Sequence, residues 1–102
     1  MMKMIYCTCN VSKLDILLKA LEELDVSDYQ VVEQVIAKNR KGAPRFNTAI
    51  WPGYNSVITL QVREEEKVRS LAEKIKKMNA ESYNEDELIT FCSWTLDDYF
   101  FD

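Results

Sequence analysis

The sequence predicts an α+β domain in which four strands and two helices follow the order βαββαβ. Three observations lead to this prediction. Four stretches are rich in apolar, β-branched or aromatic residues, and two others carry apolar residues at helical spacing. Both glycines and both prolines fall within a single segment, residues 39–53. At 102 residues, the chain is expected to form one domain over residues 1–102.

The first strand and the first helix are expected over residues 3–11 and 13–24. Residues 4–11 carry no charge on either face of the strand, so we expect both faces to be covered. Ser12 has the side chain of a helix N-cap, and Asp15, three residues on, is a weak capping-box partner. The apolar stripe of the helix lies at helical spacing and consists of Leu14, Leu17, Leu18, Leu21 and Leu24.

The middle of the chain predicts two strands joined by a long loop. After a turn at 25–28, residues 29–38 are rich in Val, Ile and Tyr, which is typical of a strand. Residues 39–53 hold the glycines and prolines, which break regular structure, and are therefore expected to form a loop. Residues 54–63 alternate in their side chains with the period of a strand.

The last third of the chain predicts a helix, a polar linker and a strand. Glutamates at 64–66 begin the helix and lysines end it, an order of charge that suits the helix dipole. The linker is expected over residues 79–87, the fourth strand over 88–96, and an acidic, aromatic tail over 97–102. The buried stripe of this helix is expected to consist of Val68, Leu71, Ala72, Ile75 and Met78.

This order of elements is that of the ferredoxin-like fold, a four-stranded antiparallel sheet with two helices on one face. The other face of the sheet would present Met4 and Tyr6. Such a face is too apolar to remain in contact with water. The sequence therefore predicts that copies of the chain associate through the sheet.

Composition excludes several classes of function. A net charge of -4 gives no general attraction to nucleic acid, which binds clustered Lys and Arg. No run of 18 apolar residues is present, so no membrane insertion is expected, and the first residues do not resemble a signal peptide. The three cysteines are an odd number without framework spacing, which favours reduced thiols and a cytoplasmic location.

The chain contains no histidine, and this argues against catalysis. Histidine is the commonest general base and the commonest metal ligand, and catalytic triads of the Ser-His or Cys-His kind are excluded without it. An enzyme would need a nucleophile and a base drawn from Cys, Asp, Glu, Lys and Tyr, and no pair of these is suggestively spaced. We therefore expect binding and assembly, not an enzyme.

Several stretches resemble the nitrogen-regulatory PII signalling proteins. Residues 3–5, followed by Ser12-Lys13-Leu14-Asp15 and the helix at 17–21, are similar to the first strand and Lys-Leu-Asp-led helix of that family. Residues 32–35, followed by Asn39-Arg40-Lys41-Gly42, are similar to the second strand and to the basic start of the so-called T-loop. The third strand and second helix are similar in layout, so the resemblance covers nearly the whole chain.

The resemblance implies a homotrimeric regulatory or sensor protein, acting in nitrogen regulation or related signalling, without turnover. Its subunits would share clefts for a small ligand, and the T-loop would contact a regulated protein partner. Family members that bind ATP carry a glycine-rich, basic turn after the second helix. Residues 79–86 contain no glycine and are net negative, so we expect no nucleotide phosphate there. The sequence does not identify a cofactor.

The loop at 39–53 is the predicted ligand-binding segment. Arg40, Lys41 and Arg45 lie beside Gly42 and Pro44, and clustered basic residues in a loop suit an anionic ligand or an acidic partner. The aromatic residues of the segment, above all Trp51, suit a binding anchor. The alternative is a solvated charged loop whose aromatics fold back onto the sheet. The predicted site residues are Arg40, Lys41, Gly42, Arg45 and Trp51.

Two further groups of residues are candidates for metal binding. Cys7 and Cys9 would lie on one face of a strand, and Cys92 on a strand that pairs with it, but a zinc site would want a fourth ligand. Buried thiols are ordinary core residues, and we predict no metal site. The acidic tail, with Asp97, Asp98 and Asp102, would suit a hard cation but is more simply solvated.

Two alternatives therefore stay open at this point. One is the PII-like sensor, and the other is a divalent-cation-binding protein similar to the related CutA-type trimers, which share the fold.

The loop at 39–53 is longer than a simple hairpin turn, and such loops are usually functional or disordered. We expect it to be mobile alone and to become ordered on contact with a ligand or partner.

Overall fold

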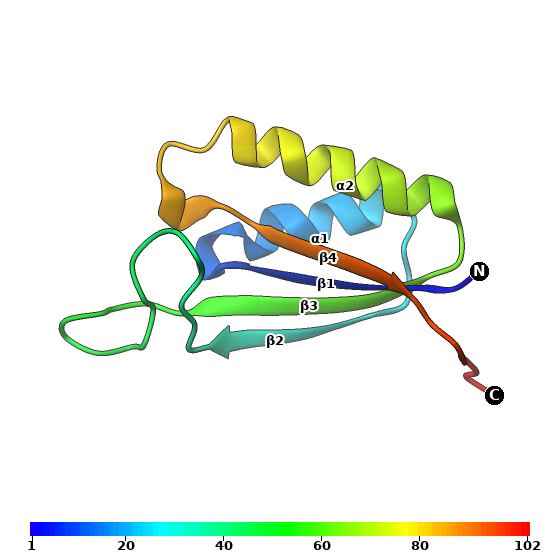
Figure 1. Cartoon of the computed structure of the whole chain (residues 1–102), viewed down its shortest axis with the longest axis horizontal. Coiled ribbons are helices and arrows are strands. Elements are labelled where there is room, and N and C mark those ends of the chain that lie inside the picture. Colours follow the sequence, from blue (N-terminus) through cyan, green and yellow to red (C-terminus); the bar gives the residue numbers. More distant parts are fainter.

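The computed structural model describes residues 1–102 as an antiparallel sheet whose two helices cover one face (Figure 1). The strands lie in the order β2-β3-β1-β4, which confirms the predicted ferredoxin-like α+β fold. Neither helix is long and apolar enough to cross a membrane. The elements are β1 (Lys3–Asn10), η1 (Val11–Lys13), α1 (Leu14–Glu23), β2 (Tyr29–Val35), β3 (Asn55–Val62), α2 (Glu65–Ala80), η2 (Glu85–Glu87) and β4 (Thr90–Thr95), where η denotes a 3-10 helix.

The strand β1 lies at the centre of the sheet and fixes its register. It pairs with β3 from Lys3 opposite Val62, and with β4 from Lys3 opposite Thr95. The strands β2 and β4 form the two edges. The pairing of β2 with β3 shifts between Val32 and Val35, next to the long loop. Both ends of this loop therefore lie at one end of the sheet, opposite the end where the chain termini lie (Figure 1).

The core lies between the helices and the sheet face that they cover. The strand residues that point toward the helices are apolar, and each helix contributes one stripe at the predicted spacing. Val68 and Met78 of the second stripe are only partly buried, since they lie at its margins. The most deeply buried apolar residues are Ile5, Cys7, Cys9, Leu17, Leu21, Ile58, Leu60, Leu71 and Ile75.

The start of α1 differs from the prediction. Ser12 is not the N-cap, because residues 11–13 form the 3-10 turn η1 ahead of the helix. The side chain that caps this turn is Asn10, whose Oδ1 accepts a hydrogen bond from the backbone N–H of Ser12 at 3.1 Å. An asparagine directly after a strand can accept from the N–H two residues on, and here that contact turns the chain.

The sheet face away from the helices is partly apolar and partly polar. On its β4 side, the side chain of Trp94 is 47% exposed, and on its β2 side that of Val32 is 52% exposed. Between them, the amide of Gln61 exchanges hydrogen bonds with Gln30 and donates to the Met4 sulfur at 3.2 Å. We call this surface the open face. Its association with other copies remains a prediction.

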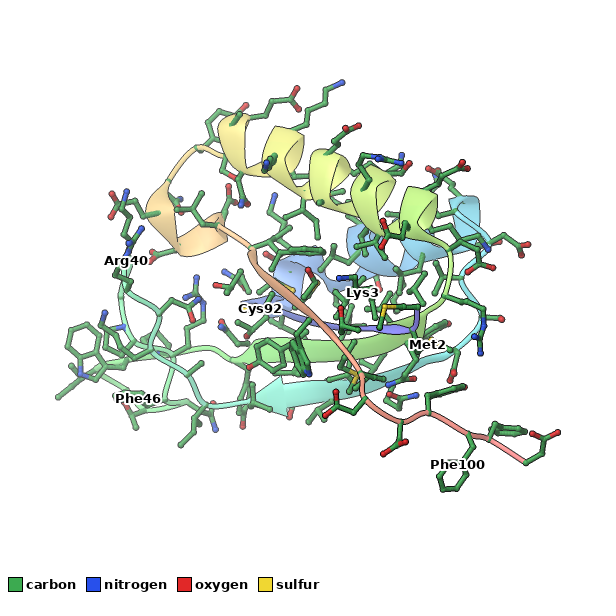
Figure 2. The ribbon with its side chains drawn as sticks, turned by 45° about the vertical axis from the view of Figure 1, so that its right-hand side comes forward. Met2, Lys3, Arg40, Phe46, Cys92 and Phe100 are labelled. Carbon is green, nitrogen blue, oxygen red and sulfur yellow. The ribbon has the colours of Figure 1, made fainter.

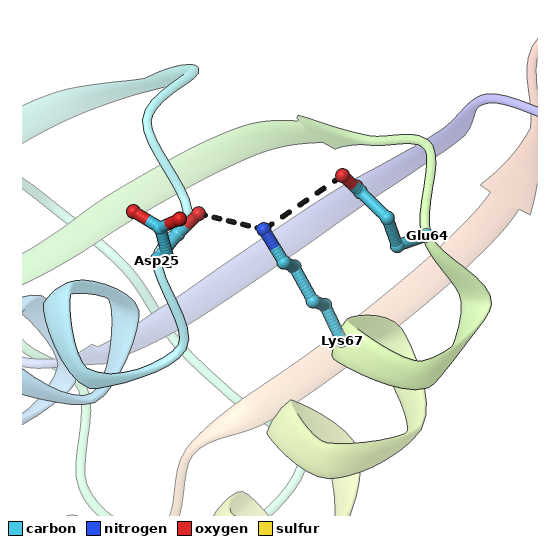
Figure 3. Close-up of polar contacts among 3 residues, drawn as sticks. All are labelled: Asp25, Glu64 and Lys67. Atoms are coloured by element: carbon cyan, nitrogen blue, oxygen red, sulfur yellow. Dashed lines mark hydrogen bonds and ion pairs between the residues drawn. The ribbon is translucent and has the colours of Figure 1, made fainter.

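A lysine on α2 ties the end of α1 to the start of α2 (Figure 3). Asp25 has a φ of 56°, a left-handed conformation that ends α1 and turns its carbonyl toward α2. Lys67 Nζ donates to this carbonyl oxygen at 2.8 Å and lies 3.7 Å from Glu64 Oε1. One ammonium group therefore holds the two helix ends against each other.

Replacing Lys67 with methionine is expected to lower the free energy of unfolding by about 1 kcal/mol. The substitution keeps most of the aliphatic stem and removes one charge-assisted hydrogen bond at a partly exposed position. Urea unfolding followed by circular dichroism would measure the change. The matched control is Lys76→Met on the exposed side of the same helix, and equal losses in the two variants would contradict the role given to Lys67.

Candidate functional site

The long loop between β2 and β3 crosses the end of the sheet and contacts η2. It leaves from β2, at one edge, and reaches the turn that precedes β4, at the other edge (Figure 1). At its base the backbones of Ala37 and Arg45 pair with each other, with N–O distances of 2.9 and 2.8 Å. At the far side the N–H of Ala43 donates to Asp86 Oδ1 at 2.7 Å. The loop is thus fixed at two places before it forms any site.

Gly42 lies beside η2, next to the residue whose N–H bonds to Asp86. Its φ is 87°, in the left-handed region that side chains disfavour. A Cβ atom at this position would lie 2.6 Å from Asp86 Oδ1 and 3.2 Å from the carbonyl oxygen of Glu85. Both the backbone conformation and the close approach therefore require glycine here. The structure gives Gly42 a role in docking the loop, and its role in ligand binding remains a prediction.

Arg45 is buried, with an exposed fraction of 9%. Its guanidinium donates to the backbone carbonyl oxygen of Asp86 and, at 3.5 Å, to that of Ala43. These donors are therefore already used within the chain, and Arg45 braces the loop against η2. A substitution of Arg45 would disturb the loop itself. It follows that a triple replacement of Arg40, Lys41 and Arg45 would lower stability as well as remove charge from the loop.

The tip of the loop forms a turn that is closed on itself. The N–H groups of Phe46 and Thr48 both donate to the carbonyl oxygen of Trp51, at 3.1 and 3.0 Å, and the N–H of Trp51 donates to Thr48 Oγ1 at 2.9 Å. The side chain of Trp51 is 42% exposed, and that of Ile50 is 78% exposed. The tip therefore presents apolar side chains outward, as an anchor for a partner would require.

Two clefts flank the docked loop, and the predicted site residues divide between them. The Arg40 cleft has a volume of about 220 Å³ and lies between residues 39–41 and the start of β4, where Glu85 and Thr90 contribute to its wall. The Trp51 cleft has a volume of about 500 Å³. Arg40 and Lys41 line the first, Arg45 and Trp51 line the second, and Gly42 lies in the chain between them.

The two clefts differ in their charge. Arg40 and Lys41 are exposed and make no ion pair within the chain, and they face the single carboxylate of Glu85. Figure 2 shows Arg40 at the upper side of the loop, on the side of η2. The Trp51 cleft instead contains Asp86 and Glu87, and its one basic group, Arg45, is already bonded. The Arg40 cleft is thus the one with free positive charge.

Residues 79–87 take part in the site, although no pattern in the sequence indicates it. The structure shows that Asn79 fixes this segment, since its amide exchanges hydrogen bonds with the backbone of Ile89 at 2.9 and 2.8 Å. Asp86 then receives the loop through a side-chain oxygen and a backbone oxygen. Composition showed only a polar linker there. Asn79 and Glu85 also line the Arg40 cleft, so the linker forms one of its walls.

A larger hollow, of about 630 Å³, lies elsewhere on the molecule. It runs along α1 toward the first residue of β2, and its charged lining is three carboxylates, from Asp15, Glu22 and Asp25, against Lys19. None of the predicted site residues reaches it. Size therefore does not decide which cleft is the site, and the basic loop residues favour the smaller one.

The cysteines do not converge. Cys7 and Cys9 point into the core, whereas Cys92 pairs with Tyr6 in the register and lies exposed on the open face. Burial raises the pKa of the Cys7 thiol to about 12, with smaller contributions from Cys9 and Cys92, and burial raises the pKa of Cys9 to about 11. The two core thiols therefore stay protonated at neutral pH, a form that neither attacks nor binds soft metals well.

The structure contains no group of three or more Cys, Asp or Glu side chains placed to hold a metal ion. In the acidic tail, Asp97, Asp98 and Asp102 are exposed and point into solvent from an extended segment. The three-cysteine arrangement considered from the sequence is wrong, because Cys92 lies on the other face of the sheet from Cys7 and Cys9.

Comparison with solved structures identifies proteins that share this fold. No protein-family model matches the sequence, and no curated protein matches it as a sequence relative. Among solved structures, a PII-like signalling protein of Thermus thermophilus matches with a TM-score of 0.61 and 16% identity, over 91% of this chain and 84% of that one. CPII of Thiomonas intermedia, bound to ADP and bicarbonate, matches with a TM-score of 0.68 and 14% identity, over 95% and 89%.

The apo form of CPII, a nitrogen regulatory PII-like protein, matches with a TM-score of 0.59 and 15% identity, over 91% of this chain and 88% of that one. The matches run over nearly the full length of both partners. The chain therefore has the fold of the PII-like proteins, and the resemblance stated from its sequence is confirmed at the level of the fold.

Proposed function

We propose that residues 1–102 form a PII-like regulatory domain that binds a small anionic ligand in the Arg40 cleft and does not turn it over. The observation that carries this proposal is the pair of free cations, Arg40 and Lys41, held at a cleft by a loop docked on η2. The PII-like fold supports it, because CPII has been solved with ADP, AMP and bicarbonate. The lack of histidine and of an arranged nucleophile supports binding without catalysis.

The proposed ligand is an anion recognised chiefly by the loop. The wall formed by residues 79–87 offers no glycine-rich turn for a phosphate, and it carries Glu85, Asp86 and Glu87. Positive charge thus comes from Arg40 and Lys41, while Gly42 and Arg45 hold the loop against η2. A compact anion such as bicarbonate can be bound by these two cations alone. So can a nucleotide that places only one anionic group in the cleft.

The tip of the loop is the proposed contact for a regulated protein partner. Its base is fixed by Ala43 and Arg45, so any ordering on binding would concern residues 46–53. Trp51 and Ile50 supply exposed apolar area, and Phe46 is 39% exposed on the same tip (Figure 2). Ligand in the cleft and partner at the tip would be coupled through the docked segment that joins them.

The proposed assembly is a cytoplasmic homotrimer built through the open face. Trp94, Val32 and Tyr6 supply its apolar part, and covering them would remove exposed aromatic and aliphatic surface from water. Light scattering at micromolar concentration should give three times the mass of the chain. A well-behaved monomer would contradict the assembly without bearing on the ligand.

Replacing Arg40 and Lys41 together with alanine is expected to weaken binding of the anion by at least about a hundredfold. Two charge-assisted hydrogen bonds to a small anion contribute roughly 1.5–3 kcal/mol each, and each 1.4 kcal/mol is a factor of ten. Isothermal titration calorimetry with ADP, AMP and bicarbonate in turn would measure the loss. Unfolding midpoints should stay within error, because neither residue is buried.

The matched control is Lys76→Ala with Lys77→Ala, which removes the same net charge from the exposed surface of α2. Equal losses in both double variants would show a general charge effect and contradict the site. Absence of binding to all three compounds by the unaltered chain would refute this choice of ligand class.

A further inference from the structure

Residues 97–102 leave the body of the protein as an exposed aromatic tail. Phe100 and Phe101 are 86% and 89% exposed, and three aspartates flank them. Figure 2 shows Phe100 at the end of this tail, away from the sheet and helices. Single exposed apolar residues are ordinary, but two adjacent phenylalanines with this exposure form a patch that has a cost in water unless something covers it.

The start of the tail is held in a defined direction. The N–H of Leu96 donates to the carbonyl oxygen of Met2 at 3.0 Å, and Tyr99 Oη donates to Asp28 Oδ2 at 2.5 Å. Asp28 precedes β2, so this bond draws the tail to the β2 edge of the sheet. The two phenylalanines follow directly after the anchored tyrosine, and they are therefore presented at a fixed place.

A groove whose apolar and basic lining complements the aromatic, acidic tail lies at the other edge of the sheet. It runs between α2 and β4, has a volume of about 230 Å³, and is floored by Val68, Ala72 and Phe91. Small-molecule sites usually measure about 300–1,000 Å³, so this groove suits a side chain better than a ligand. The charged residues around it are two basic groups, Lys3 and Arg69, and one acidic group, Glu65, with Ser93 completing the rim.

The strand beside this groove is an open edge. β4 pairs with β1 on one side and with nothing on the other, so its outer backbone groups are free. An exposed strand edge is a ready partner for an extended segment, and the tail has no helix or strand of its own. The groove therefore offers apolar floor, net positive charge and free backbone to a segment that is aromatic, acidic and extended.

We infer that the tail of one chain docks into the groove between α2 and β4 of a second copy. The inference rests on the proposed assembly into a homo-oligomer and adds to it a contact that the open face does not provide. A chain cannot place its own tail there while Tyr99 is bonded to Asp28, because Asp28 and the groove lie at opposite edges of the sheet. The contact therefore forms between copies, with Phe100 or Phe101 on the apolar floor and the aspartates toward Lys3 and Arg69.

The test is a disulfide between two differently tagged full-length chains expressed together. One chain carries Phe101→Cys and the other Ala72→Cys, both with Cys92→Ser so that no exposed native thiol interferes. The comparison chain carries Val32→Cys on the open face instead of Ala72→Cys. Mild oxidation, a non-reducing gel and mass spectrometry of the linked peptides give the yield of the mixed disulfide, and circular dichroism checks that each chain folds.

The expected result is about tenfold more mixed disulfide with Ala72→Cys than with Val32→Cys, because docking raises the effective concentration of the two thiols. Arg69→Glu in the Ala72→Cys chain should lower the yield, whereas Lys76→Glu, outside the groove, should not. Equal yields at Ala72 and Val32, or a higher yield at Val32, would overturn the inference. So would a disulfide formed within a single chain carrying both Phe101→Cys and Ala72→Cys.

Light scattering on the unaltered chain separates this inference from the proposed function. An oligomer without the Phe101–Ala72 disulfide contradicts the tail contact and leaves the assembly standing. A monomer contradicts both the assembly and the contact, while calorimetry with the anions still decides the ligand.

Discussion

Replacing Gly42 with alanine is expected to destabilise the protein by about 2–5 kcal/mol, or to release the loop from η2, and in either case to abolish anion binding. A left-handed backbone costs a residue with a Cβ about 1–2 kcal/mol, and forcing an atom into an occupied space costs about 1–3 kcal/mol more. At Gly42 both apply, since φ is 87° and the new Cβ would meet Asp86 Oδ1 at 2.6 Å.

Gly53 is the matched control for this experiment. It has nearly the same conformation, with a φ of 92°, but its Cβ would have only Arg45 side-chain carbons nearby, the nearer being Cδ at 3.9 Å. Gly53→Ala therefore has the conformational cost without the clash. Urea unfolding and calorimetry on both variants would isolate the effect of the close approach to Asp86. Equal effects would mean that the close approach to Asp86 adds no cost at Gly42, which would contradict the role given to this glycine.

Raising the pH above 9 is expected to remove several kcal/mol from the free energy of unfolding through the two core thiols. The pKa values of Cys7 and Cys9 are raised from the ordinary 9.0 to about 12 and about 11, chiefly by burial. A raised pKa in the folded state gives stability that is complete below pH 9 and is lost as the pH rises toward the folded values. Each thiol contributes a slope of about 1.4 kcal/mol per pH unit in that window.

The double variant Cys7→Ala and Cys9→Ala tests this assignment. It lowers stability at pH 7 because it leaves small cavities in the core, but it should have a flatter dependence on pH between 9 and 11 than the unaltered chain. Urea unfolding at a series of pH values measures the difference in slope between the two proteins. Parallel curves would show that the thiols do not ionise on unfolding.

The helices and strands could be predicted because their signals are local. The stripe that contains Leu71 and Ile75 fixes the buried side of α2, and the alternation in residues 54–63 fixes that of β3. The sequence prediction was wrong where the local backbone conformation decides which residue caps a helix. Ser12 has the side chain of an N-cap, yet the 3-10 turn η1 gives that role to Asn10.

The loop could be found from its composition, but its internal roles could not. Clustered Arg and Lys indicated a binding segment, and Arg40 and Lys41 do lie free at a cleft. Arg45 looked equivalent to them in the sequence, but its partner is a backbone carbonyl 41 positions away, which no side-chain pattern encodes. The 3-10 turn η2 could not be predicted either, because its three acidic residues show no apolar periodicity.

The central place of β1 has a consequence for the order in which the protein forms during synthesis. This strand is synthesised before the other three strands of the sheet, pairs with β3 only after residue 62 has been made, and pairs with β4 only after residue 95. At a synthesis rate of about 5–20 residues per second, the side of β1 that pairs with β4 stays unpaired for seconds after β3 has paired with the other side. The turn that receives the loop directly precedes β4, so the Arg40 cleft forms only when the sheet is complete, and anion binding would distinguish chains with a complete sheet from chains without β4.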